Sequence, residues 1–214
     1  MRVLIRGLGE LCITAGLILL LFVTYELWGT GRYTHDQQNK LSKEMMRSWA
    51  SGQPAGAGKI TTERVKLGKG LALIRIPRFG SSYRYVVIEG VSLADLRKGP
   101  GHYPGTQLPG EVGNFVVSGH RTTYSAPFNR VGELKPGDEI DIDTRDGKYV
   151  YKVTEKRVVD PTDVEVTAPV PFHPGQRAGK RMITLTTCHP MYSAAERLIV
   201  FGQLSAQYPR VTGK

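Results

Sequence analysis

Cysteine is scarce in this chain of 214 residues, since only Cys12 and Cys188 are present. Cys12 lies within an apolar run, so the two thiols are not expected to pair, and a disulfide framework is excluded. Cysteines exported to an oxidising compartment are usually paired. An unpaired Cys188 in an exported domain is therefore a candidate reactive thiol.

Clustered positive charge is also missing, although the net charge is +10. No run of five or more Lys and Arg residues occurs, whereas nucleic-acid-binding domains usually gather basic residues on one face or helix. An anionic membrane or cell-wall surface is an easier partner for a diffuse positive field. We expect no nucleic-acid partner.

The spacings Cys-x-x-Cys and His-x-x-x-His are absent as well. Zinc sites usually combine such ligands at short spacings. We therefore do not expect a metal around Cys188, whose conceivable histidine co-ligands are His102, His120 and His189.

One long apolar run is present, near the N-terminus. No charged residue occurs from Leu11 to Tyr25, and most residues there are Leu, Ile, Val or Phe. Because a helix needs about 20 residues to cross a bilayer, we expect a transmembrane helix over Leu8–Trp28. Tyr25 and Trp28 would then lie in the outer aromatic belt.

Charges beside this run predict its orientation. Arg2 and Arg6 precede it, so the positive-inside rule predicts a cytoplasmic N-terminus and an extracytoplasmic remainder in a single-pass membrane protein. A cleaved signal peptide and a buried core helix are the alternatives. No clean small-x-small cleavage site follows the run, which favours an uncleaved signal anchor.

Composition divides the chain into three parts. Residues 1–28 are the predicted cytoplasmic N-terminus and membrane anchor, 29–69 an extracytoplasmic tether, and 70–214 the folded domain. The tether is polar and contains a Gly/Pro/Ala stretch at 51–58, a composition that is typical of flexible linkers. A short helix around Gln38–Ala50 remains an option within it.

Beyond residue 70, short β-branched segments alternate with turn signals. The segments are 71–77, 85–89, 114–120, 139–143, 149–159, 182–188 and 197–203. Many short strands at roughly even spacing predict an all-β barrel or sandwich. Asp146-Gly147 predicts a hairpin turn, and short helices are expected at Ser92–Lys98, with Ser92 as N-cap, and at Ala126–Gly132.

Cys188 ends one of these strands. Alternation places Met182, Thr184, Thr186 and Cys188 on one face of it. Pro190 stops the strand directly afterwards, so Cys188 would lie at a rigid strand end beside a loop, which suits a nucleophile. A buried cysteine packed as a small hydrophobic residue is the alternative, but the threonines around it are unusually polar for that.

Arg197 begins the strand that follows, after a loop of eight residues. If this strand returns antiparallel, Arg197 lies next to Cys188 across the hairpin. A guanidinium group there could stabilise a developing oxyanion. Alternatively, Arg197 is a rim residue that pairs with Glu196 or another acid.

His120 ends another strand, over residues 114–120. A thiolate nucleophile needs a proton partner, and histidine is the usual one. Strand ends that lie far apart in sequence can be adjacent in space. From the residues alone His102, in Gly101-His-Tyr-Pro-Gly105, competes with His120 for this role.

Together these segments resemble the sortase family. Thr184-Leu-Thr-Thr-Cys188 matches the sortase motif Thr-Leu-x-Thr-Cys, and Val117-Ser-Gly-His-Arg121 looks like the sortase histidine segment. Glu196-Arg197 with its apolar strand is similar to the family's arginine strand. The resemblance covers about residues 70–206. The stretches 101–106 and 109–114 look most like class E sortases of high-GC Gram-positive bacteria.

This resemblance implies a sortase-type eight-stranded β-barrel and a cysteine transpeptidase that joins proteins to the cell wall. Cys188 would attack the carbonyl between Thr and Gly of a Leu-Ala-x-Thr-Gly sorting signal. His120 would protonate the leaving amine, and Arg197 would steady the oxyanion. An amine of a peptidoglycan precursor would then resolve the thioacyl intermediate. The implied substrate-binding residues are Tyr103, Thr186 and Thr187, and Thr187 could add an oxyanion contact.

The resemblance implies no cofactor. The acidic residues nearest to a calcium cluster are Asp141, Asp143 and Asp146, which are expected to flank a hairpin, so no metal dependence is predicted. Three other functions stay open: a membrane-tethered cysteine hydrolase with the same residues, a pilin-polymerising sortase, and a catalytically silent wall-binding module.

Overall fold

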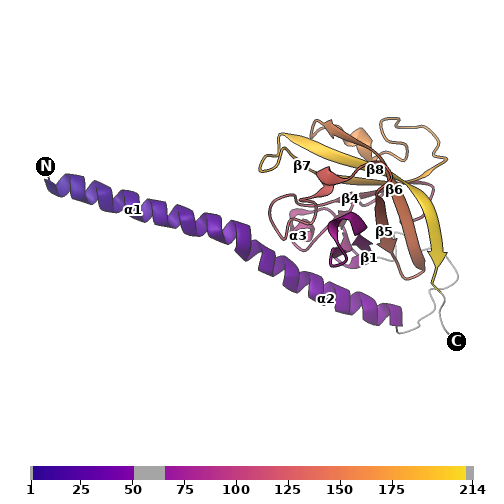
Figure 1. Cartoon of the computed structure of the whole chain (residues 1–214), viewed down its shortest axis with the longest axis horizontal. Helices are drawn as coiled ribbons and strands as arrows, with labels where there is room; N and C mark the ends of the chain where they lie inside the picture. The colour runs from indigo at the N-terminus through magenta and orange to yellow at the C-terminus, as the bar shows by residue number, and fades with distance from the viewer. Residues whose placement is uncertain (1, 51–65, 211–214) are drawn as a thin grey trace.

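Eight strands form a closed β-barrel (Figure 1) in the computed structural model, which describes residues 2–50 and 66–210. The strands are β1 (Gly70–Arg75), β2 (Arg84–Glu89), β3 (Gly101–His102), β4 (Gly113–Ser118), β5 (Glu139–Asp143), β6 (Gly147–Val159), β7 (Arg181–His189) and β8 (Glu196–Pro209). Their order around the barrel is β1-β2-β3-β4-β7-β8-β6-β5, and β1 pairs with β5 to close it. The predicted eight-stranded all-β barrel is confirmed.

Alternating side chains fill the barrel. Phe115, Val117, Ile183 and Leu185 of the β4–β7 pair point inward and are fully buried. Because successive side chains of a strand point to opposite faces, the residues between them lie on the outer face. Burying each large apolar side chain stabilises the fold by about 1.5–3 kcal/mol, which determines which side chains of each strand point inward.

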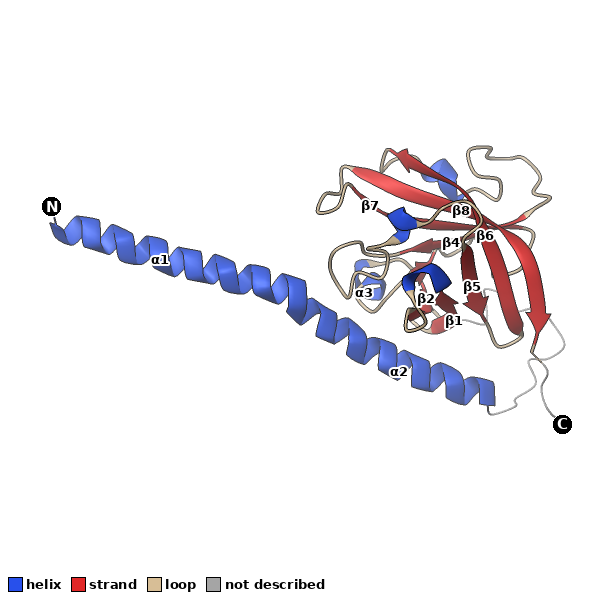
Figure 2. Ribbon diagram, in the orientation of Figure 1, coloured by secondary structure: helices blue, strands red, loops and turns tan. Residues whose placement is uncertain are grey.

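The helices that lie between the strands are short and peripheral to the barrel (Figure 2). The helix α3 (Leu93–Leu96) has Ser92 as its N-cap, whose hydroxyl oxygen accepts from the Asp95 N–H at 3.2 Å, as the sequence predicts. The helix expected over Ala126–Gly132 is wrong. A 3₁₀ turn is present at Val131–Glu133 instead, and residues 124–126 have positive φ, which a right-handed helix does not allow.

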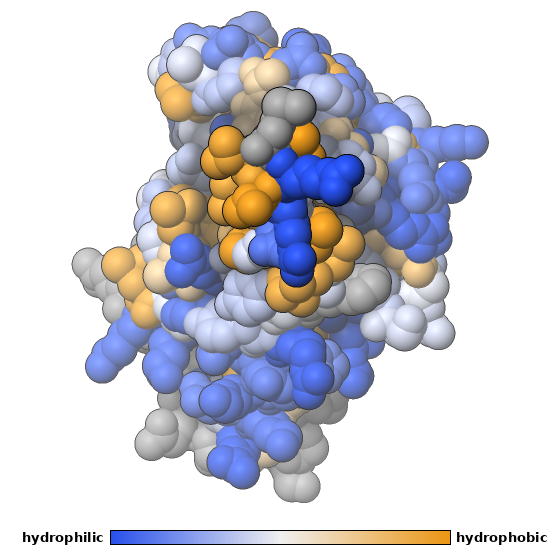
Figure 3. Space-filling model, turned by 90° about the vertical axis from the view of Figure 1, so that its left-hand side faces the viewer, coloured by the Kyte–Doolittle hydropathy of each residue, from blue (hydrophilic) through white to orange (hydrophobic). Residues whose placement is uncertain are grey.

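A long helical rod precedes the barrel (Figures 1 and 2). It consists of α1 (Arg2–Thr24), a π-helical turn (Tyr25–Gly29) and α2 (Thr30–Ala50). Within the described residues, α1 is the one helix long and apolar enough to cross a membrane. Figure 3 looks at the rod from its N-terminal side, where hydrophobic side chains stand in front of the more polar barrel.

The second helix of the rod packs on the barrel. Leu41 and Met45 of α2 form a cluster with Leu73, Val86 and Ile88 of β1 and β2. The flexible tether expected over residues 29–69 is therefore wrong for residues 30–50, while residues 51–65 lie outside the described residues. The helix is longer than the option at Gln38–Ala50, because a stripe of residues at helical spacing finds a surface to cover.

Gln38 supplies the main polar contact between α2 and the barrel. Its Oε1 accepts from the Val86 N–H at 2.6 Å, and its Nε2 donates to the carbonyl oxygens of Val86 at 3.1 Å and Lys98 at 2.9 Å. A glutamine side chain thus binds backbone groups of β2 and of the segment before β3.

We predict that Gln38→Ala weakens the docking of α2, because it leaves a part-buried N–H and two carbonyls without their partner. Such a loss costs about 1–3 kcal/mol. Thermal unfolding of the full chain in detergent should show a lower midpoint for this variant. Asn39→Ala, at the neighbouring exposed position, should unfold like the unchanged protein. Equal midpoints for both variants would contradict the assignment.

Candidate active site

Three strand ends meet at one edge of the barrel. β4 runs parallel to β7, and β7 runs antiparallel to β8. The carboxyl ends of β4 and β7 and the amino end of β8 therefore lie together. Cys188 is directly opposite Arg197 in the β7–β8 register, so the expected neighbourhood across the hairpin is confirmed.

His120 comes to the same edge through β4. The β4–β7 register pairs Ser118 with Thr186, and the Gly119 N–H donates to the Thr186 carbonyl at 3.1 Å. His120 and Cys188 each follow this pair by two residues, so His120, just beyond the end of β4, comes near the end of β7 that carries Cys188. Both side chains are partly exposed, and by alternation Cys188 belongs to the outer face of the barrel.

The imidazole of His120 has one ring nitrogen without a hydrogen-bond partner in the described part of the chain. Its Nε2 is buried and has no hydrogen-bond partner among the described residues, and its ring centroid lies 5.0 Å from that of Tyr124. Burial lowers the pKa of His120 below its ordinary value, and the positive charge of Arg97 lowers it further. Both effects disfavour the imidazolium, so in the free protein a proton on His120 is held weakly.

The backbone before His120 is tightly fixed. A Cβ at Gly119 would approach the buried ring of Phe128 to 2.7 Å, so only glycine fits without movement. The Thr187 hydroxyl donates to the Gly119 carbonyl at 2.7 Å. These contacts join the ends of β4 and β7 below the site.

Thr187 is not brought to the face that carries Cys188. By alternation it points to the other face, it is 3% exposed, and its hydroxyl hydrogen is used by Gly119. An oxyanion contact from this hydroxyl is therefore not supported. Thr186, in contrast, lies on the outer face two residues before Cys188 and is 8% exposed.

Arg197 keeps donors available. Its Nη1 donates to the carbonyl oxygens of Ala194 and Glu196, each at 2.9 Å, which holds the β7–β8 connection. Arg197 forms no ion pair with the Glu196 carboxylate in the described part of the chain. Because a guanidinium group has five N–H donors, its Nε and Nη2 can still bind a substrate oxygen.

Arg121 is a residue whose place the sequence reasoning missed. Its Nη1 donates to the Cys188 carbonyl at 3.1 Å and to Nδ1 of His189 at 2.8 Å. The contact joins the segment after His120 to the end of β7. It also occupies His189, the sequence neighbour of Cys188. The sequence signal that could have pointed to Arg121 is its position directly after His120.

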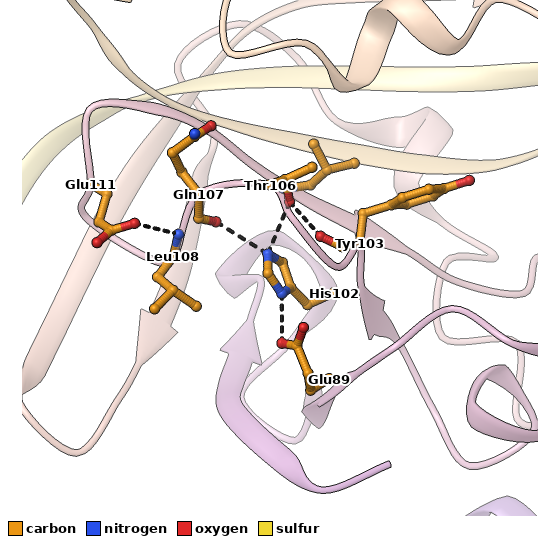
Figure 4. A network of polar contacts seen from close by, with 8 residues as sticks. Glu89, His102, Tyr103, Thr106, Gln107, Leu108 and Glu111 are labelled. Carbon is orange, nitrogen blue, oxygen red and sulfur yellow. Dashed lines mark hydrogen bonds and ion pairs between the residues drawn. The ribbon is translucent and has the colours of Figure 1, made fainter. Parts of the chain in front are cut away.

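The competing histidine, His102, is excluded as the proton partner of Cys188. It is fully buried, and Figure 4 shows its ring between two sets of partners. Nδ1 lies 2.7 Å from a Glu89 carboxylate oxygen, and Nε2 lies 2.9 Å from the Thr106 hydroxyl and 3.2 Å from the Gln107 carbonyl. Both ring nitrogens are occupied inside the barrel wall.

This network supports the segment that carries Tyr103. The Thr106 hydroxyl donates to the Tyr103 carbonyl at 2.7 Å, and the Tyr103 N–H donates to the Val116 carbonyl at 2.9 Å. Tyr103 is 37% exposed and points away from His102 (Figure 4). It therefore stands at the outer face beside β4, one strand away from β7.

The β6–β7 connection covers the far end of the same outer face. The Asn114 side chain donates to the carbonyl oxygens of Val166 and Ala168, each at 3.0 Å, and its Oδ1 accepts from the Thr184 hydroxyl at 2.7 Å. Asn114 and Thr184 are fully buried beneath this connection. Among the outward-facing residues at this end of β7, Thr186 is nearly buried and Cys188 is partly exposed.

Two of the three acidic residues considered for calcium are used in ion pairs. Asp141 pairs with Lys148 at 2.7 Å, and Asp143 pairs with Arg75. No group of three or more potential metal-binding side chains occurs in the described part of the chain. The pairs lie on the β1–β5–β6 side of the barrel.

The barrel matches a known family. A model of the sortase domain matches residues 74–205. Sortase SrtE1 of Streptomyces coelicolor is 37% identical over 98% of this chain, which spans 59% of that relative's length. Sortase SrtE2 of the same organism is 34% identical over 92% of this chain and 80% of its own length.

Solved structures agree. SrtF sortase from Corynebacterium diphtheriae is 34% identical with a TM-score of 0.68, over 73% of this chain and 93% of the other. Sortase E1 from Streptomyces coelicolor, solved with a tripeptide in its active site, is 38% identical with a TM-score of 0.62, over 69% of this chain and 94% of the other. The expected likeness to class E sortases is confirmed, and the chain belongs to the sortase family.

Proposed function

We propose that this protein is a membrane-anchored cysteine transpeptidase. It cleaves a Leu-Ala-x-Thr-Gly sorting signal between Thr and Gly and transfers the threonyl group to an amine of a cell-wall precursor. The observation that carries the proposal is the meeting of Cys188, His120 and Arg197 at one barrel edge. A thiol, an imidazole and a guanidinium group together suit acyl transfer through a covalent intermediate.

The first half-reaction forms a thioester. The Cys188 thiolate attacks the Thr carbonyl carbon, and the negative charge that develops on the oxygen is stabilised by the free N–H groups of Arg197. The C–N bond to Gly then breaks. His120 gives its proton to the departing nitrogen, so that an amine leaves rather than an amide anion.

The second half-reaction releases the product. The acceptor amine attacks the thioester carbonyl and loses a proton to His120, the C–S bond breaks, and the Cys188 thiolate is restored. If water attacks instead, the product is a free acid, and the protein acts as a hydrolase. If the amine belongs to another protein subunit, the product is a polymer.

The signal peptide would lie along the outer face of β4 and β7. Tyr103 bonds to β4 at Val116, which pairs with Thr184, four residues before Cys188. At about 3.3 Å per residue this offset is about 13 Å, the length of four extended residues such as Leu-Ala-x-Thr. We therefore expect Tyr103 to contact the Leu-Ala end, and Thr186 to contact the residue next to the scissile bond. Sortase E1 from Streptomyces coelicolor was solved with a tripeptide in its active site, which supports a peptide substrate for this protein as well.

The membrane location rests on α1. Arg2 and Arg6 lie at its N-terminal end, so the positive-inside rule favours a cytoplasmic N-terminus and an extracytoplasmic barrel. Anchored substrates and lipid-bound acceptors would then meet the enzyme at one surface.

We predict that the full chain in detergent joins a Leu-Ala-x-Thr-Gly peptide to triglycine, and that mass spectrometry detects the Thr–triglycine conjugate. Cys188→Ala should abolish the conjugate, because no thioester can form. Cys12→Ala is the matched control and should be unaffected, since Cys12 lies in α1. A hydrolysed peptide without conjugate would favour the hydrolase, and preference for Leu-Pro-x-Thr-Gly would contradict the class E signal. No reaction with either peptide would contradict the proposal.

Arg197→Ala should lower kcat/KM by about 10²–10³-fold, the usual cost of losing an oxyanion donor. Arg197→Lys should recover only part of this activity, because an ammonium group lacks the planar fork of donors. Steady-state kinetics with the same peptide would measure both. Arg145→Ala is the control, in the β5–β6 turn near the far end of β8. An Arg197→Ala variant as active as this control would exclude the oxyanion role.

The pH profile of kcat/KM should report the protonation of His120. Activity should fall as pH rises through the His120 pKa, because the acid form is lost. Arg97→Gln removes a nearby positive charge that lowers this pKa, so its alkaline limb should move to higher pH. Arg145→Gln should leave the limb in place. A limb that stays fixed or moves to lower pH in Arg97→Gln would argue against His120 as the acid.

A further inference from the structure

The turn that follows His120 has an unusual backbone. Tyr124, Ser125 and Ala126 have φ values of 52°, 61° and 42°, and none of them is glycine. Non-glycine residues rarely adopt this left-handed region, and three in succession persist only where the surrounding structure holds them. The turn therefore depends on its contacts.

Two of those contacts come from the first turn of α2. The Ser125 hydroxyl donates to the Gly31 carbonyl at 2.9 Å, and the Tyr124 N–H donates to the Thr30 hydroxyl oxygen at 3.3 Å. From the barrel, the Tyr85 hydroxyl donates to the Ser125 carbonyl at 3.2 Å. The helix thus supplies two of the three polar contacts that reach this turn from outside its own loop. Within the loop, the Ala126 N–H donates to the Thr123 carbonyl at 2.8 Å and the Asn129 N–H donates to the Ala126 carbonyl at 2.9 Å.

On its other side the turn touches the catalytic histidine. The Tyr124 ring lies 5.0 Å from the His120 ring, tilted by 35°, and the Arg97 guanidinium group lies 5.7 Å from the Tyr124 ring centroid. The Thr34 hydroxyl of α2 donates to the Arg97 carbonyl at 2.8 Å. The same helix therefore also holds the residue whose charge acts on His120.

The helix itself is fixed along its length. Thr30, Thr34, Leu41 and Met45 are buried on its barrel-facing side, and their spacing follows one helical face. Because α2 continues α1 through a single π-helical turn, the contact to Tyr124 and Ser125 lies immediately after the apolar helix. α2 and the histidine loop are thus parts of one packed unit that begins directly after α1.

We infer that α2 is a positioning element for the catalytic histidine. Thr30 and Gly31 hold the left-handed turn at Tyr124–Ala126, and the turn holds the Tyr124 ring against His120. Ser125 and Thr30 are accordingly positioning residues, which act through Tyr124 rather than on the substrate. A helix that served only as a stem for the barrel would affect stability without a selective effect on the chemical step.

The test uses the full chain in detergent and rests on the proposed function for its kinetic readout. Ser125→Ala removes the bond to Gly31, and Thr30→Val removes the bond from Tyr124 with little change of volume. Each should lower kcat by about tenfold to a hundredfold, since small misplacements of catalytic groups have such effects, while KM changes by less than about twofold. The double variant should lose less than the product of the two effects, because both act on one turn.

Ser205→Ala is the matched control. Ser205 lies in β8 and donates to the Val150 carbonyl at 3.0 Å, far along the strand from Arg197. It should keep kcat while losing a hydrogen bond of the same kind. If Ser125→Ala and Thr30→Val keep the kcat of this control, or if they raise KM with kcat unchanged, the inference is overturned.

A second readout does not need activity. In the chain labelled with ¹⁵N-histidine, the imidazole signals of His120, assigned by their loss in His120→Gln, should shift or broaden in Ser125→Ala and Thr30→Val. They should stay in place in Ser205→Ala. Unchanged His120 signals in both variants would overturn the inference even if no substrate is turned over. Failure of the unchanged protein to join peptide and amine would instead count against the proposed function.

Discussion

The parallel pairing of β4 with β7 is the constraint on which the site depends. Parallel neighbours end at the same edge of a sheet, so residues at the ends of these two strands become neighbours although 67 positions separate Arg121 from Cys188 in sequence. Parallel strands need a long crossover. Here the chain between them builds β5, β6 and the β6–β7 connection, and β8 then returns antiparallel with Arg197 at its start.

The register of this pair is as important as its direction. A slip by one residue would turn every side chain of β7 to the opposite face, so Cys188 would enter the core and Leu185 would meet water. Burial of Ile183 and Leu185 inside the barrel opposes such a slip. Local hydrogen bonds also oppose the slip, because the Thr187 hydroxyl binds the Gly119 carbonyl and Arg121 binds the Cys188 carbonyl. The nucleophile is thus held by the core packing of its own strand.

The strands and the Cys188–Arg197 pair could be predicted because they rest on short patterns: alternation, turn residues and a hairpin. The docked helix could not, since its buried face begins with Thr30 and Thr34, which read as polar tether residues. The left-handed turn at Tyr124–Ala126 was also hidden, because none of its residues is glycine. Arg97 and Arg121 gain their places only through contacts between distant segments, which periodicity does not encode.

The continuous helical course of α1 into α2 through one π-helical turn has a consequence for where catalysis can happen. If α1 spans the bilayer, α2 contacts the histidine loop one turn beyond it. This contact fixes the distance of the reactive edge from the membrane, because the domain is then not held by a flexible linker at this point. Search for partners then becomes lateral diffusion in a thin layer next to the lipid surface. Peptides that lie further out in the cell wall would then be beyond the reach of the active site.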